Sequence, residues 1–397
     1  MHFVRTNIKT TIWKFYIFCF LRNLMFLSGV MIPFFTQWGG ISLAQTQILQ
    51  SWFMFWVFVL EIPTGAVADF FGRKYSVALG ALVTAIASLV YASKPEFMIF
   101  LLAEFLFALG VALLEGADDA LLYDALKEAG REGEAKKIYG RVHSIKLSAM
   151  LISGPIGGFI ASRWGLNYPL IFGAVPMALA SIIALTIKEP SLYQAIPERK
   201  RYINIVKEGL KYVYRHKKLR RIAIDAVIVA SAAYFVIWLY QPVLQNIGLA
   251  IIYFGFFHAF LSLTEILVAN NFVFLERIAG SGKKLLKVTA ILTSIGFLIV
   301  SIMPNIVTVI IFIILSGGFG LTRMELMKAY MNKFIPSEKR ATVLSAISML
   351  RRFGLIFLNP IIGFAADASV SLALFIVGLL PLTLFLFSPI EQDTLEE

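Results

Sequence analysis

The sequence is poor in the residues that build metal, redox and catalytic sites. It contains one cysteine, Cys19, and four scattered histidines. A single cysteine cannot form an internal disulfide, and these residues lack the spacing of metal ligands. The sequence contains no HExxH, GxSxG or phosphate-loop motif, so membrane proteolysis and ATP-driven transport have no residues to carry them. We therefore expect no metal, no cofactor and no enzymatic activity.

Charged residues are scarce as well, at 15% of the chain, whereas hydrophobic residues make up 59% and the mean hydropathy is +0.79. A soluble domain carries about 25% charged residues, so the bilayer is the expected solvent. Backbone polar groups in lipid must be paired internally, which leaves helices or a closed barrel. The apolar runs are far longer than the ten-residue alternating strands of a barrel. We predict an all-α membrane protein.

Apolar runs separated by proline, glycine and charge predict twelve transmembrane helices. They cover roughly 11–33, 44–68, 74–93, 97–125, 138–162, 166–187, 220–245, 249–275, 284–303, 306–331, 338–366 and 370–389. With a cytoplasmic N-terminus, the outer loops contain only two basic residues, Lys94 and Arg163. This asymmetry predicts a multi-pass protein of the plasma (inner) membrane with both termini in the cytoplasm. It also explains the net charge of +12 through contact with lipid rather than nucleic acid.

The longest polar segment, 188–219, divides the chain near its middle. Ile203, Val206, Leu210 and Val213 recur with helical spacing, which predicts an amphipathic helix on the inner membrane surface. We therefore expect two six-helix bundles, 1–187 and 220–397, joined by this linker. The motifs PIGGFIA (155–161) and PIIGFAA (360–366) lie 205 positions apart, which indicates a duplication of the kind found in alternating-access transporters.

A polar stretch, GAVADFFGRK, separates the second and third spans. It resembles the loop G-x-x-x-D-[R/K]-x-G-[R/K]-[R/K] of the major facilitator superfamily, although Phe70 replaces the usual base. The matching residues are Gly65, Asp69, Gly72, Arg73 and Lys74. The resemblance covers essentially the whole chain and implies a transporter of small molecules with the twelve-helix fold of that family. We expect the protein to be a monomer.

The resemblance also implies a cytoplasmic gate, in which Asp69 and Arg73 form a latch with an acidic residue at the end of the fourth helix. Asp124 is the candidate partner of Arg73. Gly65 would allow close helix packing, and Gly72 would allow a tight turn. The alternative is that Arg73 and Lys74 only set the topology.

The fourth span contains Glu115, Asp118 and Asp119, whose spacing would place them on one helix face. Arg22, near the middle of the first span, is their expected counter-charge. Ionisable groups within a membrane are costly, so each suggests a function. Clustered carboxylates suit a proton carrier, and the alternative is a static ion pair between two helices.

Other polar or aromatic residues interrupt the remaining spans. Candidates for proton coupling or substrate binding are Glu61, Arg323, Glu325 and Arg351. Trp52 and Trp56 share one helix face and could form a cavity wall for apolar or cationic ligands.

The stretch ISGPIGGFIA resembles the antiporter signature of the fifth helix, with Gly154, Pro155 and Gly158 at the matching positions. In the family this motif accompanies proton-coupled exporters. The sequence therefore predicts multidrug-type antiport, that is, proton-coupled efflux of amphiphilic or drug-like molecules. One alternative is uptake or exchange of an anionic metabolite held by Arg22, Arg323 and Arg351. Another is a lipid flippase or lipid-sensing protein without ion coupling.

Overall fold

The structure is a computed structural model that describes residues 2–190 and 199–387. Within these residues every regular element is a helix. Eleven segments are long and apolar enough to cross a membrane, and Val370–Leu386 is a shorter apolar helix. They correspond in order to the twelve spans expected from the sequence.

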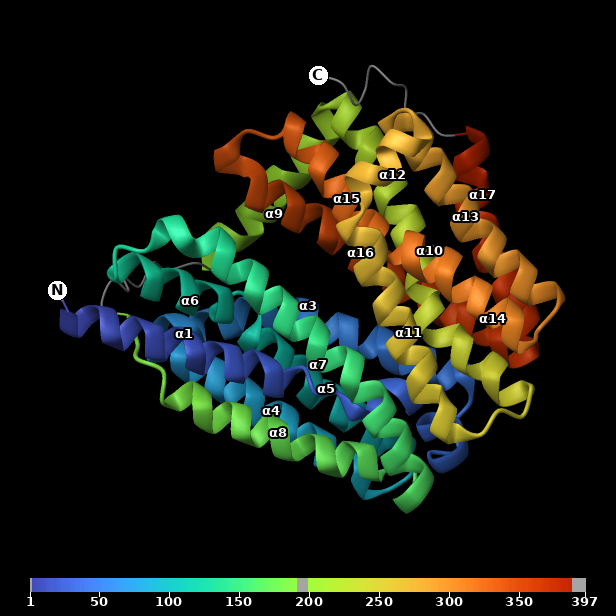
Figure 1. The fold of residues 1–397 in the computed structure, drawn as a ribbon, viewed down its shortest axis with the longest axis horizontal. Helices are drawn as coiled ribbons and strands as arrows, with labels where there is room; N and C mark the ends of the chain where they lie inside the picture. The colour runs from blue at the N-terminus through green and yellow to red at the C-terminus, as the bar shows by residue number, and fades with distance from the viewer. Residues whose placement is uncertain (1, 191–198, 388–397) are drawn as a thin grey trace. The chain divides into compact units, whose positions relative to one another are not determined.

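The described residues of the first half of the chain form eight α-helices, which run from blue to green in Figure 1. They are α1 (His2–Arg22), α2 (Met31–Pro33), α3 (Leu43–Phe71), α4 (Arg73–Ser93), α5 (Phe97–Leu114), α6 (Ala117–Glu128), α7 (Ala135–Trp164) and α8 (Tyr168–Leu185). A 3-10 helix (Phe26–Val30) precedes α2, and a π-helix (Phe34–Trp38) follows it.

The part of the second half that the structure describes forms nine α-helices. They are α9 (Arg199–Arg215), α10 (Lys217–Asn246), α11 (Ile251–Asn270), α12 (Phe272–Ala279), α13 (Gly282–Ile302), α14 (Ile306–Phe312), α15 (Thr322–Met331), α16 (Arg340–Ala368) and α17 (Val370–Phe387). A π-helix, Ile313–Leu321, joins α14 to α15. Helix α9 covers most of the predicted amphipathic segment, but the side chains of Ile203 and Val206 lie outside the described part of the chain.

Two of the expected continuous helices are broken near their middle. The first span stops being helical at Arg22 and resumes at Phe26. The fourth is interrupted at Glu115 and Gly116, where Gly116 has φ +81°. The prediction that Glu115 shares one helix face with Asp118 and Asp119 is therefore wrong, because the left-handed glycine turns the chain between them.

The chain divides into two compact units that exchange short segments. The first unit contains Met1–Gly40, Trp52–Tyr202 and Ile251–Ala259, and the second contains Ile41–Ser51, Ile203–Ala250 and Phe260–Glu397. The exchanged segments begin at positions 41 and 251, 210 residues apart and close to the 205-residue spacing of the repeated motifs. The boundaries 1–187, 188–219 and 220–397 stay a sequence-based prediction.

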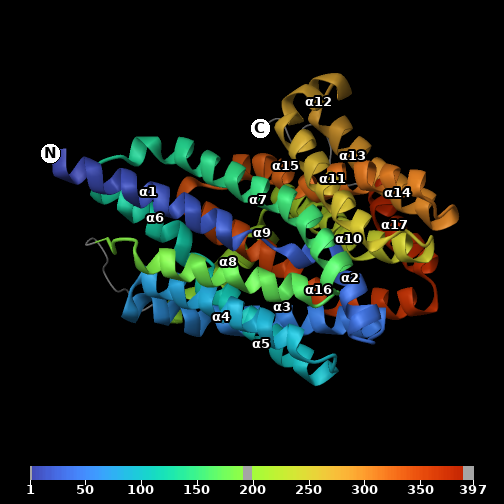
Figure 2. The ribbon, with the colours of Figure 1, turned by 60° about the horizontal axis from the view of Figure 1, so that its bottom comes forward.

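The same arrangement recurs inside each unit. Helix α4 packs along α5 and α8 in the first unit, as Figures 1 and 2 both show. Helix α13 packs along α17 and the π-helix in the second unit. These are the third, fourth and sixth spans of each half, which is what a duplication predicts.

Glycines bring helices into close contact in both units. In the first unit, a Cβ on Gly154 of α7 would lie 2.7 Å from the carbonyl oxygen of Gly255 on α11. A Cβ on Gly158 would lie 3.0 Å from the carbonyl oxygen of Ile252. The motif residue Pro155 lies between them inside α7. Small residues allow this approach because a side chain would separate the backbones.

In the second unit the repeat-related glycine of α16, Gly363, makes the corresponding crossing with the start of α3. A Cβ there would lie 2.8 Å from the Cα of Ala44. One turn further along α16, Asp367 accepts hydrogen bonds from the backbone N–H groups of Leu43 and Ala44, at 2.8 and 3.2 Å. The carboxylate thus satisfies two backbone donors at the N-terminus of α3.

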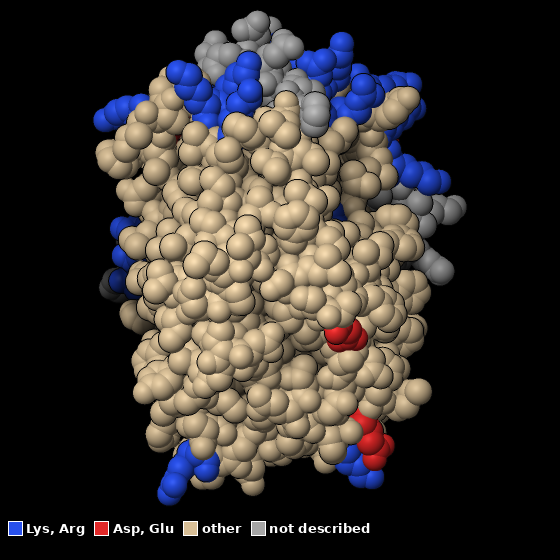
Figure 3. Space-filling view, turned by 90° about the vertical axis from the view of Figure 1, so that its right-hand side faces the viewer, with Lys and Arg blue, Asp and Glu red and all other residues tan. Residues whose placement is uncertain are grey.

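The surface charge is segregated along the molecular face drawn in Figure 3. Most of the Lys and Arg visible on this face gather near one end, some lie at the opposite end and along one edge, and the broad middle is mostly uncharged. A wide uncharged band is expected where the helices contact hydrocarbon.

We expect two alanine substitutions in α16 to have opposite effects on stability. Gly363→Ala should lower the thermal unfolding midpoint, because its Cβ would meet the Cα of Ala44 and the Cβ of Gln47, at 2.8 and 2.9 Å. Gly354 has no described heavy atom within 4 Å of the added position, so Gly354→Ala should stabilise by about 0.5–1 kcal/mol. Thermal unfolding in one detergent measures both, and equal shifts would contradict the close crossing.

Candidate functional site: ion pairs beside interrupted helices

The two helix interruptions in the first unit meet at an ion pair. Arg22 is the last residue of α1, and Asp118 lies in the first turn of α6. The Arg22 Nη1 atom lies 2.6 Å from the Asp118 Oδ2 atom, with 23% of the arginine side chain and 8% of the aspartate side chain exposed. The other carboxylate oxygen of Asp118 accepts the backbone N–H of Asp119 at 2.8 Å. The pair therefore joins two helix ends rather than two helix faces.

Further charges surround this pair. The side chains of Glu115 and Asp119 are exposed, and Lys146 of α7 interacts electrostatically with Asp119. The backbone oxygen of Asp119 also accepts a hydrogen bond from the Tyr139 hydroxyl at 2.7 Å. The contacts with α7 were not predicted from the sequence, although Lys146 interrupts an apolar span in the same way as Arg22.

A second ion pair lies in the other unit, between Asp225 of α10 and Arg323 of α15. It is almost completely buried, with 1% of the arginine and 2% of the aspartate side chain exposed. Arg323 also donates to the backbone oxygen of Leu286 at 2.6 Å and to the hydroxyl of Thr289. These partners compensate the cost of burying a guanidinium.

The two ion pairs are related by the internal repeat, with their charges exchanged. Asp118 and Arg323 lie 205 positions apart, and Arg22 and Asp225 lie 203 positions apart. Arg323 also follows an irregular segment, the π-helix Ile313–Leu321. Sequence reasoning missed Asp225, although it is the only acidic residue in the 30-residue helix α10.

The loop between α3 and α4 is held by two acidic residues. Arg73 forms an ion pair with Asp124 and donates to the backbone oxygen of Ala120 at 3.0 Å. Glu189 accepts the backbone N–H groups of Arg73 and Lys74, each at 2.8 Å. It thereby places a negative charge at the N-terminus of α4, where the helix dipole favours it. Sequence reasoning paired Arg73 with Asp124 but missed Glu189, which lies 116 residues along the chain from Arg73.

Gly72 has the backbone geometry that this loop requires. Its φ of +100° lies in a region that L-residues with side chains rarely adopt. An added Cβ would also lie 3.2 Å from the Glu189 carboxyl carbon. Gly65 is half-buried on α3, and the side chain of Asp69 lies outside the described part of the chain.

The remaining candidates occupy separate places. The Trp52 indole donates to the backbone oxygen of Leu101 at 3.0 Å, and the Trp56 ring packs 4.8 Å from the ring of Phe105. Both tryptophans therefore pack against α5.

Three charged candidates complete the set. Glu325 is exposed and pairs with Lys328 at 2.7 Å, one turn along its own helix. Glu61 on α3 and Arg351 on α16 are half-buried. Of the predicted residues, the structure therefore brings Arg22 together with Asp118 and Arg73 together with Asp124.

Comparison with known proteins decides the family. The family model of the Major Facilitator Superfamily matches residues 15–359. The chain belongs to this superfamily. Among relatives, the uncharacterized MFS-type transporter YxaM of Bacillus subtilis (strain 168) is 23% identical over 352 residues, covering 84% of this chain and 85% of YxaM. An uncharacterized transporter of Rickettsia bellii (strain RML369-C) is 27% identical over 206 residues, covering 50% of this chain and 47% of that protein.

Solved structures share the fold at low sequence identity. The nucleoside transporter NupG aligns with a TM-score of 0.75 at 13% identity, covering 95% of this chain and 97% of NupG. A bacterial homolog of the human lysosomal transporter Spinster aligns with a TM-score of 0.70 at 14% identity, covering 92% of this chain and 82% of that one. The predicted fold class, an all-α membrane protein of the superfamily type, is confirmed. The chain is a multi-pass membrane transporter.

We expect that removing one partner of the buried ion pair in the second unit lowers the stability of the protein strongly. Replacing both partners with apolar residues should lower it much less. Asp225→Asn leaves the guanidinium of Arg323 without its negative partner and should destabilise by about 3–5 kcal/mol. The double variant Asp225→Leu/Arg323→Met removes both charges and should recover most of that loss.

Thermal unfolding of the purified protein in one detergent measures these changes. Glu325→Gln is the control, because it alters an exposed pair within one helix and should cost less than about 1 kcal/mol. If the double variant is no more stable than Asp225→Asn, the unpaired charge of Arg323 is not the cause of the lost stability.

Proposed function

We propose that this superfamily member is a proton-coupled antiporter that exports amphiphilic or drug-like small molecules by alternating access. The ion pair of Arg22 and Asp118 carries the proposal. It lies where two membrane spans are interrupted, and interrupted helices near mid-span are where secondary transporters bind their substrates and coupling ions.

The pair suits a proton switch. An arginine keeps its charge, so Asp118 is the partner that changes state. When the carboxylate binds a proton, it loses its negative charge and with it the electrostatic attraction to the guanidinium of Arg22. The end of α1 and the start of α6 are then held together less tightly, and Arg22 can interact with another acceptor. Protonation thereby alters a contact between two helix ends.

The contacts of the loop between α3 and α4, in the first unit, support a role for this loop as a gate. Arg73, Asp124 and Glu189 together bind the start of α4 to α6 and to the segment after α8. We propose that these contacts form the cytoplasmic latch, with Gly65, Asp69, Gly72 and Lys74 as the surrounding motif. They would then stabilise one conformation of the transport cycle without contacting substrate.

Export is the direction favoured by the crossing of α7 and α11. The antiporter-like residues Gly154 and Gly158 lie at this close contact, and the superfamily motif that they match accompanies exporters. The alternative of an anion clamp is less favoured, because Arg22 and Arg323 are each engaged by a carboxylate. The alternative of a lipid flippase without ion coupling makes no use of these pairs.

We expect Asp118→Asn to weaken strongly the response of transport to a pH gradient. In proteoliposomes loaded with ethidium as an amphiphilic cation, an inward-directed proton gradient should drive efflux by the unmodified protein. Asp118→Asn cannot release a proton, so gradient-driven efflux should fall by about tenfold or more, while exchange of labelled for unlabelled ethidium persists. Glu132→Gln, in an exposed turn before α7, is the control for loss of one acid.

Three outcomes separate the alternatives. Unchanged gradient-driven efflux in Asp118→Asn would remove this residue as the proton carrier. Uptake of anionic metabolites in place of ethidium efflux would favour the anion transporter. Movement of labelled lipid between leaflets with no response to pH would favour the flippase.

A further inference from the structure

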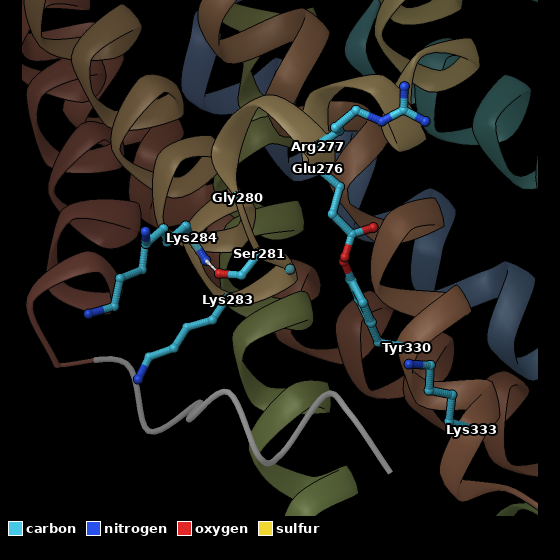
Figure 4. Close-up of a pocket in the computed structure, with 10 residues that line it drawn as sticks. Glu276, Arg277, Gly280, Ser281, Lys283, Lys284, Tyr330 and Lys333 are labelled. Atoms are coloured by element: carbon cyan, nitrogen blue, oxygen red, sulfur yellow. Dashed lines mark hydrogen bonds between the residues drawn. The ribbon is translucent and has the colours of Figure 1, made fainter.

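A basic pocket lies in the second unit, at the turn between α12 and α13 and beside the end of α15. Its volume is about 860 Å³. Figure 4 shows that its side chains come from the end of α12, the first turns of α13 and the region of Tyr330 and Lys333. Five of the lining residues are basic and one is acidic, namely Arg277, Lys283, Lys284, Lys287, Lys333 and Glu276.

Among the described residues that line the pocket, the one carboxylate forms a hydrogen bond. The Glu276 Oε1 atom accepts a hydrogen bond from the Tyr330 hydroxyl at 2.9 Å, as Figure 4 also shows. A Cβ on Gly282 would lie 2.7 Å from this hydroxyl and 2.9 Å from that carboxylate oxygen. The glycine therefore allows the start of α13 to approach the Glu276–Tyr330 contact closely.

The N-terminus of α13 adds to the positive charge of the pocket. Lys283, Lys284 and Lys287 all lie within its first two turns, where the helix dipole favours an anion. Ser281 caps the helix by accepting the backbone N–H of Lys284 at 3.3 Å. A cavity with five cations, one engaged carboxylate and a helix N-terminus is suited to a compact, multiply charged anion such as phosphate.

The repeat shows how this site differs from the loop of the first unit. Gly282, Lys283 and Lys284 occupy the positions of Gly72, Arg73 and Lys74, 210 residues earlier. In the first unit Arg73 is paired with Asp124. The residue 206 positions after Asp124 is Tyr330, which supplies a hydroxyl in place of a carboxylate. The second half has therefore kept the basic turn, and a tyrosine stands near the place of the acid that pairs with Arg73 in the first half.

Exposed apolar residues on α12 indicate which anion reaches the pocket. Val273, Phe274 and Ile278 are 75%, 57% and 68% exposed, on the same short helix as Glu276 and Arg277. Large apolar side chains beside a basic cluster are typical of a segment that lies at a membrane interface. A phosphate on a lipid can contact the pocket while its acyl chains contact α12, whereas free phosphate uses only the charges.

We propose that this pocket binds a phosphate-bearing anion and that its source is the headgroup of an anionic phospholipid. The basic residues hold the phosphate at the N-terminus of α13, and the apolar side chains of α12 pack against the lipid's acyl chains. The site is independent of the proton-coupling pair, since it lies in the other unit and uses other residues.

The test compares two triple variants that each remove three positive charges. The pocket variant is Lys283→Gln/Lys284→Gln/Lys287→Gln. The control is Lys127→Gln/Lys136→Gln/Lys137→Gln, which changes exposed lysines at the end of α6 and the start of α7. The purified full chain is titrated in a neutral detergent with phosphatidylglycerol, phosphatidylcholine or inorganic phosphate, and the thermal unfolding midpoint is measured.

Phosphatidylglycerol should raise the midpoint of the unmodified protein and of the control, and the pocket variant should require at least about tenfold more lipid for the same rise. Phosphatidylcholine should have little effect on any of the three. An equal response of all three proteins to phosphatidylglycerol would overturn the site. A rise with inorganic phosphate equal to that with the lipid, and lost in the pocket variant, would overturn the lipid as the source.

A further variant separates loss of charge from loss of folding. Lys283→Arg/Lys284→Arg/Lys287→Arg keeps the three charges and should keep the response to phosphatidylglycerol. If this variant responds as weakly as the glutamine variant, the proposed charge recognition is wrong.

Discussion

The structure depends on how charges are held where membrane helices are interrupted. A continuous helix satisfies its own backbone groups in lipid, but an interrupted one leaves donors and acceptors at both new ends. In this chain the interruption of the first span and that of the fourth meet at Arg22 and Asp118. Each charged side chain thus lies at a helix end, where polar groups are already concentrated. In the second unit, Arg323 likewise lies just after an irregular segment, the π-helix Ile313–Leu321.

The duplication explains why such features occur in pairs. Both units contain a glycine crossing, at Gly158 and at Gly363, and both contain a buried or half-buried ion pair between their first and fourth spans. The exchange of charges between the two pairs is compatible with the duplication, because an ion pair has the same attraction when its partners are interchanged. The more deeply buried second pair suits a structural role, and the more accessible first pair suits one that changes state.

The sequence predicted those contacts for which a local pattern identifies the residue and few other residues could be its partner. Arg22 is the only basic residue in the middle of the first span, so its pairing with an acid of the fourth span followed from the cost of charge in lipid. Arg73 was paired with Asp124 through the family motif. Glu189 was missed, because nothing in a polar segment distinguishes an acid that caps a distant helix from one that is solvated. Asp225 is a single acid in a long apolar helix, but its sequence context does not indicate which basic residue it contacts.

The sequence by itself determined that the chain is helical and membrane-embedded, because long apolar runs have only one way to satisfy their backbone in lipid. It also determined the number and order of the spans, through hydropathy and through the proline, glycine and charged residues that separate the apolar runs. The tertiary structure alone decided where the helices are interrupted and which carboxylate each arginine contacts. The φ of Gly116 and the exchange of 41–51 and 251–259 between units result from packing among distant segments, and such packing leaves no periodic signal in the chain.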